Sequence, residues 1–187
     1  MPSADPRVTR SRDAILASAL ELLGEGGLGR VTIDEVSRRS GVAKTTIYRH
    51  WPTRADLVID TCAQLSTSQS APDTGSFAGD ATALLSDLAT LLERERWATV
   101  LPSVVDAAER DQQLAAVHAG LQESQVAPYR AVIERAIARG ELPAQTDVPA
   151  VISALVGPLF YRRWFSREPI DAVFVRHLVE AAMSGSF

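Results

Sequence analysis

The chain has 187 residues, of which 46% are hydrophobic, and this suffices for one or two domains with a sizeable core. Its net charge of −4 and its pI of about 5.4 argue at first against a nucleic-acid partner. A single cysteine excludes an internal disulfide, no apolar run approaches the roughly 20 residues of a transmembrane helix, and no signal-peptide core is evident, so we expect a cytoplasmic protein without membrane association.

Apolar residues recur at helical spacing along most of the chain, and the two-residue alternation typical of strands is not evident. The pattern predicts an all-α fold with about nine helices. The first predicted helix ends at the glycine-rich stretch 24–27. Its apolar stripe consists of Ile15, Leu16, Ala19, Leu20 and Leu23.

The segment from Thr32 to Leu57 places two short helices and a longer third helix in immediate succession. Thr32, followed by Glu35 three residues later, forms a capping box in which each side chain satisfies a backbone N–H of the first turn. A helix is therefore predicted to start near Ile33. Gly41 stands where this helix must stop and the chain must reverse, at a position that commonly requires a positive φ.

The next helix is predicted to begin at Ala43 or Lys44. Only Ile47 is expected to turn inward, which is too little apolar surface for a core helix. Its polar residues are Lys44, Thr45, Thr46, Tyr48, Arg49 and His50. Thr53 and the proline before it end this helix, and Thr53 with Asp56 forms a second capping box at the start of a longer helix.

This succession is the layout of a helix-turn-helix DNA reader, and the segment resembles the DNA-binding domain of the tetracycline-repressor (TetR) family of transcriptional regulators. The positions that carry the resemblance are Thr32, Gly41-Val42, Thr46-Ile47-Tyr48, Trp51 and Thr53-Arg54. Ala43 departs from the family pattern because a capping Ser is usual there, so the recognition helix lacks a cap of roughly 1 kcal/mol. Trp51 in place of Phe and Arg54 in place of Lys keep the apolar plug and the cation.

Two other classes of function find less in the sequence. The three histidines are scattered, and the chain has no His-x-x-x-His, no cysteine pair, no Gly-x-Ser-x-Gly and no glycine-rich phosphate loop, so no catalytic residue, metal site or cofactor is predicted. A helical protein-interaction module would use the same polar helix as a contact surface. Salt separates that alternative from DNA binding, which weakens steeply as ionic strength rises.

The distribution of charge removes the objection that the acidic pI raised. Residues 1–54 hold nine Lys and Arg against six Asp and Glu, whereas residues 55–187 hold ten against seventeen. Residues 1–54 are therefore predicted to form the DNA-binding domain, and residues 55–187 a regulatory and dimerisation domain. Arg7, Arg10 and Arg12 belong either to a solvated tail or to an arm that enters a minor groove.

Downstream, the stretch 66–79 is rich in Ser, Thr, Pro and Gly and predicts a loop. A fifth helix follows, with an apolar stripe over 81–92, and a sixth is predicted from about 97 to 108 with Pro102 near its first turns. A long seventh element starts near Leu114. Pro128 should kink or interrupt it, and Gly140 should end it.

The last two predicted helices carry long apolar seams. Asp147 caps the first of them, with Pro149 in its first turn. Its seam consists of Val148, Val151, Ile152, Leu155, Val156, Leu159 and Phe160. The final seam consists of Ile170, Val173, Phe174, Leu178, Ala181 and Ala182.

The family resemblance implies that these two helices build a four-helix dimer interface, which would set two recognition helices one turn of duplex apart on a palindromic DNA operator. The alternative is that the seams pack only within their own subunit. The expected interface residues are Val156, Pro158, Phe160, Tyr161, Trp164, Phe165, Phe174 and Leu178. The resemblance also favours a repressor over an activator, although the sequence itself does not decide between them.

The resemblance further implies a cavity enclosed by the fourth to seventh helices, in which a small apolar or aromatic effector with one polar handle binds and changes the separation of the DNA-binding heads. The expected lining residues are Leu65, Leu88, Leu92, Trp97, Leu101, Val104, Val105, His118, Tyr129 and Ile133. Each of them could equally be ordinary core.

The segment also suggests roles for individual residues at the DNA. Thr45 and Thr46 are expected to approach base edges, with Lys44 and Arg49 as guanine readers or phosphate contacts. The residues expected to hold backbone phosphates are Thr32, Tyr48, His50 and Arg54.

Overall fold

The computed structural model describes residues 6–65, 70–93 and 95–185. These residues form nine α-helices, one 3₁₀ turn and one π-type turn, with no strand among them, so the predicted all-α fold is confirmed. They pack into two compact units. One unit contains residues 6–65 and 95–121, and the other contains residues 70–93 and 122–185.

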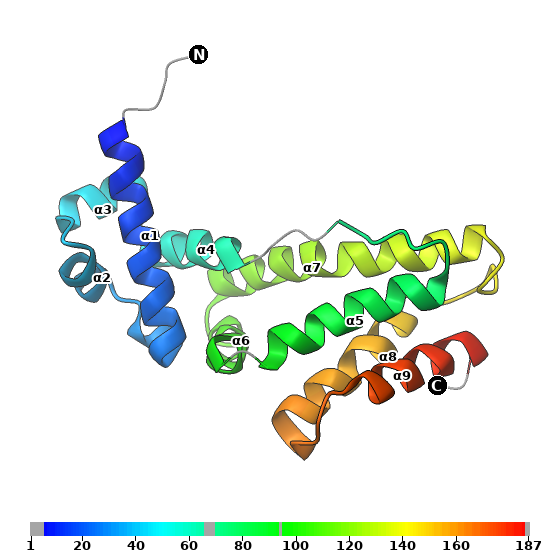
Figure 1. The fold of residues 1–187 in the computed structure, drawn as a ribbon. Helices are drawn as coiled ribbons and strands as arrows, with labels where there is room; N and C mark the ends of the chain where they lie inside the picture. The colour runs from blue at the N-terminus through cyan, green and yellow to red at the C-terminus, as the bar shows by residue number, and fades with distance from the viewer. Residues whose placement is uncertain (1–5, 66–69, 94, 186–187) are drawn as a thin grey trace, which may run out of the picture. The chain divides into compact units, whose positions relative to one another are not determined.

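The first unit is built around α1, against which α2, α4 and α6 pack (Figure 1). Its elements are α1 (Pro6–Gly26), the 3₁₀ turn η1 (Leu28–Arg30), α2 (Ile33–Ser40), α3 (Lys44–His50), α4 (Arg54–Leu65), α6 (Glu95–Ala108) and the beginning of α7 (Gln112–Ala138). α4 and α6 belong to this unit because both pack on α1, and the division into functional domains after residue 54 stays a prediction.

One face of α1 supplies much of the core of this unit. The residues of the predicted stripe that are buried are Ile15, Leu16, Ala19 and Leu23. Leu20 is only half-buried, whereas Leu22, which the predicted stripe omitted, is completely buried. Fully burying one large apolar side chain contributes roughly 1.5–3 kcal/mol to the free energy of folding. The buried face of α1 therefore stabilises the packing of the short helices that follow.

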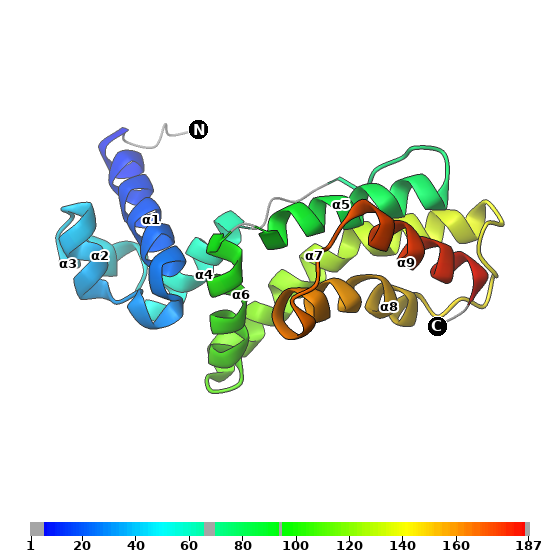
Figure 2. The ribbon, with the colours of Figure 1, turned by 60° about the horizontal axis from the view of Figure 1, so that its bottom comes forward.

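The second unit has its own core. Its elements are α5 (Phe77–Glu93), the end of α7, α8 (Val148–Tyr161), the π-type turn η2 (Arg162–Ser166) and α9 (Ala172–Ser184). α5 packs against α8 and α9, and α8 packs against α9 (Figure 2). The core includes Phe77, Leu84, Leu85, Leu92, Ile133, Leu155 and Leu159.

The start of α5 differs from the predicted one. The loop was expected to continue to Gly79, but α5 begins at Phe77, whose side chain is completely buried. The Ser76 hydroxyl accepts a hydrogen bond from the backbone N–H of Gly79 at 3.1 Å, which caps the first turn. Burial of Phe77 therefore outweighs the loop-like composition. Residues 66–69 of the predicted loop lie outside the described residues.

α7 shows that a proline need not break a helix. It runs without interruption from Gln112 to Ala138, although Pro128 lies inside it, so of the predicted kink or interruption the interruption does not occur. A proline in a helix removes one backbone hydrogen bond. Burial of α7 residues before and after Pro128 compensates for the lost hydrogen bond, because Leu114 belongs to the core of the first unit and Val132 to the core of the second. Gly140 ends the helix with φ +75°, as predicted.

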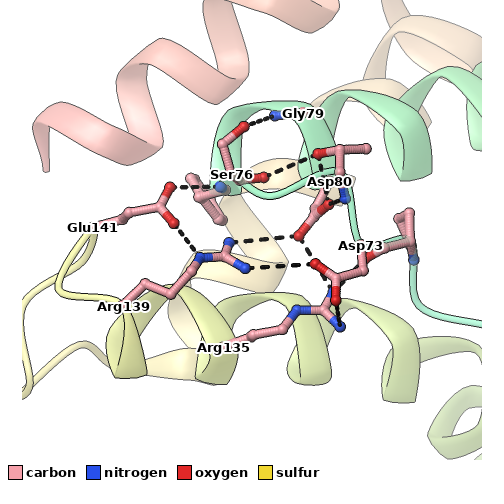
Figure 3. Close-up of polar contacts among 10 residues, drawn as sticks. Asp73, Ser76, Gly79, Asp80, Arg135, Arg139 and Glu141 are labelled. Atoms are coloured by element: carbon pink, nitrogen blue, oxygen red, sulfur yellow. Dashed lines mark hydrogen bonds and ion pairs between the residues drawn. The ribbon is translucent and has the colours of Figure 1, made fainter.

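A polar cluster that the sequence did not predict joins three segments of the second unit (Figure 3). Its centre is Asp80 in α5, whose side chain is completely buried. The Asp80 carboxylate accepts hydrogen bonds from the backbone N–H of Thr74 at 2.6 Å and from its hydroxyl at 2.8 Å. Arg135 of α7 and Arg139, which directly follows this helix, approach the same carboxylate at 3.3 and 3.6 Å. Burial tends to raise the pKa of Asp80, but the bonds from Thr74 and the charge of Arg135 hold that pKa below its usual value.

A second carboxylate completes this cluster. Glu141 accepts a hydrogen bond from the backbone N–H of Phe77 at 2.6 Å and another from Arg139 (Figure 3). These two bonds lower the pKa of Glu141. Arg135 donates to the carbonyl of Pro72. The start of α5, the segment before it and the end of α7 are thus held by charge-assisted hydrogen bonds.

An aspartate caps the start of each of the last two helices, and the first of these caps was predicted. Asp147 accepts from the N–H of Ala150 at 3.1 Å, which confirms it as the cap of α8. Asp171 caps α9 in the same way. The buried face of α9 is nevertheless rotated from the predicted seam. Its buried residues are Val175, Val179 and Ala182, whereas Val173 is 50% exposed.

Within the described residues, no helix combines the length and the apolar character needed to span a bilayer.

Candidate nucleic-acid interface

α2 starts at Thr32, but only half of the predicted capping box forms. The Thr32 hydroxyl accepts a hydrogen bond from the N–H of Glu35 at 3.2 Å, as predicted. The Glu35 carboxylate does not return the bond, because it accepts hydrogen bonds from Arg38 instead. The N–H of Thr32 donates to the carbonyl of Arg30 at 2.9 Å, so the backbone replaces the missing acceptor.

The turn between α2 and α3 is held by local hydrogen bonds. Gly41 has φ +70°, as its predicted role requires, and its N–H donates to the carbonyl of Ser37 at 3.1 Å. The Ser37 hydroxyl donates to the carbonyl of Val42, and the Ser40 hydroxyl accepts from the N–H of Val42. Neither serine was predicted, although short hydroxyl side chains beside a glycine turn are the residue types that form such bonds.

α3 presents a polar surface. Ile47 is completely buried and is the residue of α3 that enters the core. The exposed residues of α3 are Lys44, Thr45, Tyr48 and Arg49, and the half-buried ones are Thr46 and His50. Ala43 precedes the helix with extended backbone and no side-chain cap, so the missing cap expected from the sequence is confirmed.

Trp51 fastens the end of α3 to two other helices. Its side chain is buried, and its indole Nε1–H donates to the carboxylate of Asp60 in α4 at 2.9 Å. Asp60 also accepts from Arg12 of α1 at 2.8 Å, and the Arg12 guanidinium lies 5.7 Å from the centre of the Trp51 ring. The His50 ring lies beside Trp51, and its Nε2 atom is buried without a hydrogen-bond partner among the described residues.

These contacts correct one expectation for the N-terminal arginines. Arg10 and Arg12 lie within α1, which begins at Pro6, so neither is part of a flexible arm. Arg12 is engaged with Asp60. The side chain of Arg7 lies outside the described residues.

The second capping box forms completely and sets the start of α4. The Asp56 carboxylate accepts from the N–H of Thr53 at 2.9 Å and from its hydroxyl at 2.7 Å, and the N–H of Asp56 donates back to the Thr53 hydroxyl at 3.1 Å. Local spacing was sufficient to predict this pair.

Arg54 has a structural role that was not predicted. Its Nε–H donates to the carbonyl of Val31 at 2.6 Å, and a second guanidinium nitrogen donates to the carbonyl of Leu28. These bonds hold η1 against the start of α4. Arg54 is still exposed, so its contact with a phosphate stays a prediction.

Acidic side chains pair with most of the cations around α2 and α3. Lys44 lies 2.7 Å from Asp34, and Arg39 donates to Glu25 at 3.0 Å. The bond from Arg39 is the main cause of a lowered pKa at Glu25. Arg49 has no such partner in the part of the chain that the structure describes.

Comparison with known proteins agrees with this geometry. Residues 15–61 match the family described as bacterial regulatory proteins, tetR family. Residues 71–182, more than half of the chain, match the tetracyclin repressor-like C-terminal domain. The chain belongs to the TetR family.

Relatives and solved structures extend the TetR similarity over nearly the whole chain. The regulator YdeS of Bacillus subtilis is 31% identical over 96% of this chain and 91% of its own. A protein of Mycobacteroides abscessus named DNA-binding transcriptional repressor TetR is 31% identical over 92% of this chain and 90% of its own. The TetR-family regulator SCO0332 has a TM-score of 0.74 at 28% identity, covering 95% of this chain and 98% of its own.

A more distant structure shares the TetR fold. The regulator FadR of Bacillus subtilis, solved in complex with stearoyl-CoA, has a TM-score of 0.72 at 15% identity and covers 94% of this chain and 99% of its own.

The residues expected to line the TetR effector cavity fall in both units. Those in the first unit are Leu101, Val104, Val105 and His118, and those in the second are Leu88, Leu92, Tyr129 and Ile133. The side chains of Leu65 and Trp97 lie outside the described residues. The Tyr129 hydroxyl donates to the carbonyl of Leu84 at 3.4 Å, and burial raises the pKa of Tyr129. The cavity itself stays a prediction.

The residues expected at the TetR dimer interface include two exposed aromatics. Tyr161 is 60% exposed and Phe165 is 75% exposed, and their rings stack with centroids 5.7 Å apart. The half-buried members of the set are Val156, Pro158, Phe160, Trp164, Phe174 and Leu178. Solvent-exposed stacked aromatics are typical of a surface that another protein covers.

Proposed function

We propose that this TetR-family regulator is a repressor that binds a palindromic operator as a homodimer and is released by a small apolar or aromatic effector. The observation that carries the DNA-binding part is the exposed polar surface of α3, fixed at one end by the Gly41 turn and at the other by Trp51. A rigidly mounted polar helix of this kind suits insertion into a major groove. Action on chromosomal DNA would place the protein in the cytoplasm.

The exposures of α3 support a division of roles. Thr45 and Arg49 are exposed, and Arg49 has no ion pair among the described residues, so both are free to approach base edges. Thr46 and Lys44 are proposed to contact bases beside them. The residues proposed to hold phosphates are Thr32, Tyr48, His50 and Arg54.

The homodimer rests on Tyr161 and Phe165. These two stacked side chains leave an apolar surface in water, and pairing with a second copy would remove it. A two-fold dimer would present two copies of α3 to half-sites about 34–36 Å apart. The proposed interface includes the other six expected residues of α8, η2 and α9.

The effector part rests on the family and on the ligand that one neighbour holds. FadR was solved with stearoyl-CoA, so this fold accommodates a largely apolar ligand. An effector can act only by binding one arrangement of the protein better than another. Within the second unit, the proposed contacts are Leu88, Leu92 and Ile133, with the Tyr129 hydroxyl as polar partner.

Selection of genomic fragments by the purified protein tests the proposal. We expect enrichment of one short inverted repeat, and we expect Thr45→Ala to enrich an altered repeat, whereas Tyr48→Phe should weaken all fragments to a similar degree. Fragments that share no motif after repeated rounds would contradict the proposal.

A further inference from the structure

Asp34 and Lys44 form an ion pair across the helix-turn-helix. Asp34 lies in the first turn of α2, and Lys44 is the first residue of α3. Their charged atoms are 2.7 Å apart, and the side chains are 77% and 53% exposed. An ion pair this exposed adds little to stability, because water screens the charges and two side chains lose freedom. A carboxylate in the first turn of α2 also suits the helix dipole, and its contact with Lys44 adds a link to α3.

The neighbouring cations show the same arrangement. Arg38 is paired with Glu35 on α2, and Arg39 with Glu25 of α1. Each such pair cancels a charge that would otherwise attract phosphates. Lys44 is distinct because it lies on α3 itself, where a direct contact with DNA is proposed.

A DNA contact by Lys44 must compete with Asp34. To reach a base or a phosphate, the Lys44 ammonium has to leave a carboxylate at hydrogen-bond distance, and that carboxylate is then left beside the polyanion. Both effects oppose binding to any sequence. At a site that offers Lys44 a well-placed acceptor such as guanine O6 or N7, the new hydrogen bonds offset these two costs. At a site without such an acceptor, the costs are not offset and binding is weaker.

We infer that Asp34 is a specificity-determining residue, which competes with DNA for Lys44 and so suppresses sequence-independent binding. The inference rests on the proposed function, since it presupposes that α3 meets DNA.

Asp34→Asn tests the inference, because asparagine keeps the shape of the side chain and removes its charge. Affinity is measured by fluorescence anisotropy between 50 and 300 mM KCl, on a 30-base-pair duplex of mixed sequence and on the duplex enriched by the wild-type protein. We expect the variant to bind the mixed duplex about five- to tenfold more tightly and its salt dependence to steepen by about one unit of log K against log salt. Affinity for the enriched duplex should increase less, so the ratio of the affinity for the enriched duplex to that for the mixed duplex should fall.

Asp106→Asn is the matched control. Asp106 is also exposed and pairs with Arg110 at 2.8 Å, but it lies on α6, so the substitution changes the net charge equally without freeing a cation of α3. Its affinities should equal those of the wild type. The double variant of Asp34→Asn with Lys44→Met should show little of the gain on the mixed duplex, because no lysine is left to release.

The outcomes separate the inference from the function on which it rests. Equal behaviour of Asp34→Asn and Asp106→Asn, or a full gain in the absence of Lys44, would overturn the inference while the wild type still binds DNA. Failure of the wild type to bind either duplex at any salt concentration would overturn both. Asp34→Ser, with a residue that also suits a helix start, should repeat the result of Asp34→Asn if the asparagine variant melts at a lower temperature.

Discussion

The indole nitrogen of Trp51 donates a hydrogen bond to the carboxylate of Asp60 at 2.9 Å, and this bond ties the end of the recognition helix α3 to α4. Arg12 of α1 donates to the same carboxylate oxygen. The position of α3 therefore depends on one acidic side chain that two helices share.

Trp51→Phe removes the donor and keeps the apolar plug. We expect the free energy of unfolding, measured in urea, to fall by about 1–2 kcal/mol, and DNA affinity to fall with it, since α3 loses its fastening. The same substitution in an Asp60→Ala background is the matched control, because the indole then has no acceptor to lose. Equal losses from Trp51→Phe in the two backgrounds would contradict the role given to the Trp51 bond.

Ala43→Ser supplies the cap that α3 lacks. The extended backbone at Ala43 suits a capping hydroxyl, so the variant should gain about 0.5–1 kcal/mol in the free energy of unfolding. Amide hydrogen exchange at Thr45 to Tyr48 in the free protein should slow. Ala43→Val, which offers no acceptor, should show neither change, and slowing in both variants would count against capping as the cause.

Asp80→Asn removes the buried charge that Arg135 and Arg139 face. We expect the free energy of unfolding to fall by about 2 kcal/mol at pH 7. This is less than for a fully buried ion pair, because both arginines are partly exposed. The pKa of Asp80 is lower in the folded protein than in the unfolded chain, so its stabilisation is present above the ordinary aspartate value of about 3.9 and is lost as the pH falls below it.

Urea unfolding at pH 7, 5 and 3 checks this prediction. The difference between wild type and Asp80→Asn should be constant from pH 7 to 5 and should narrow at pH 3. Glu168→Gln in the same unit removes an exposed carboxylate that pairs with Arg162 at 3.3 Å, and it should change the free energy of unfolding little at any of these pH values. A difference that stays unchanged at pH 3 would show that the charge of Asp80 is not what stabilises the cluster.

Phe165→Glu places a charge on the proposed dimer surface. Because Phe165 is 75% exposed, the variant should fold normally but sediment as a monomer at micromolar concentration, where the wild type sediments as a dimer. Met183→Glu is the control, since Met183 is an exposed apolar residue of α9 outside the proposed set. If Phe165→Glu formed dimers as stable as those of the wild type, the dimer interface would not include Phe165.

The features that were predicted correctly depend on contacts between residues close together in the chain. The Thr53 and Asp56 box and the Gly41 turn are set by partners within four positions, so spacing alone identified them. The Glu35 half of the first box failed because Arg38, equally close, is a stronger partner for a carboxylate than a backbone N–H.

What the sequence missed depends on tertiary contacts. The Asp80 carboxylate meets Arg135 across 55 positions, and Arg54 meets carbonyls more than 20 positions earlier, so no local pattern announces either contact. The buried face of α9 also follows from its packing against α5 and α8 rather than from its own composition, which is apolar on several sides.

The most direct test of the central claim is the affinity of the wild-type protein for the enriched duplex and for a shuffled duplex of the same composition, measured as a function of salt. A regulator that reads its operator with α3 should prefer the enriched duplex by at least about a thousandfold, and both affinities should fall steeply as salt rises. Equal affinity for the two duplexes, or binding that salt does not weaken, would contradict it.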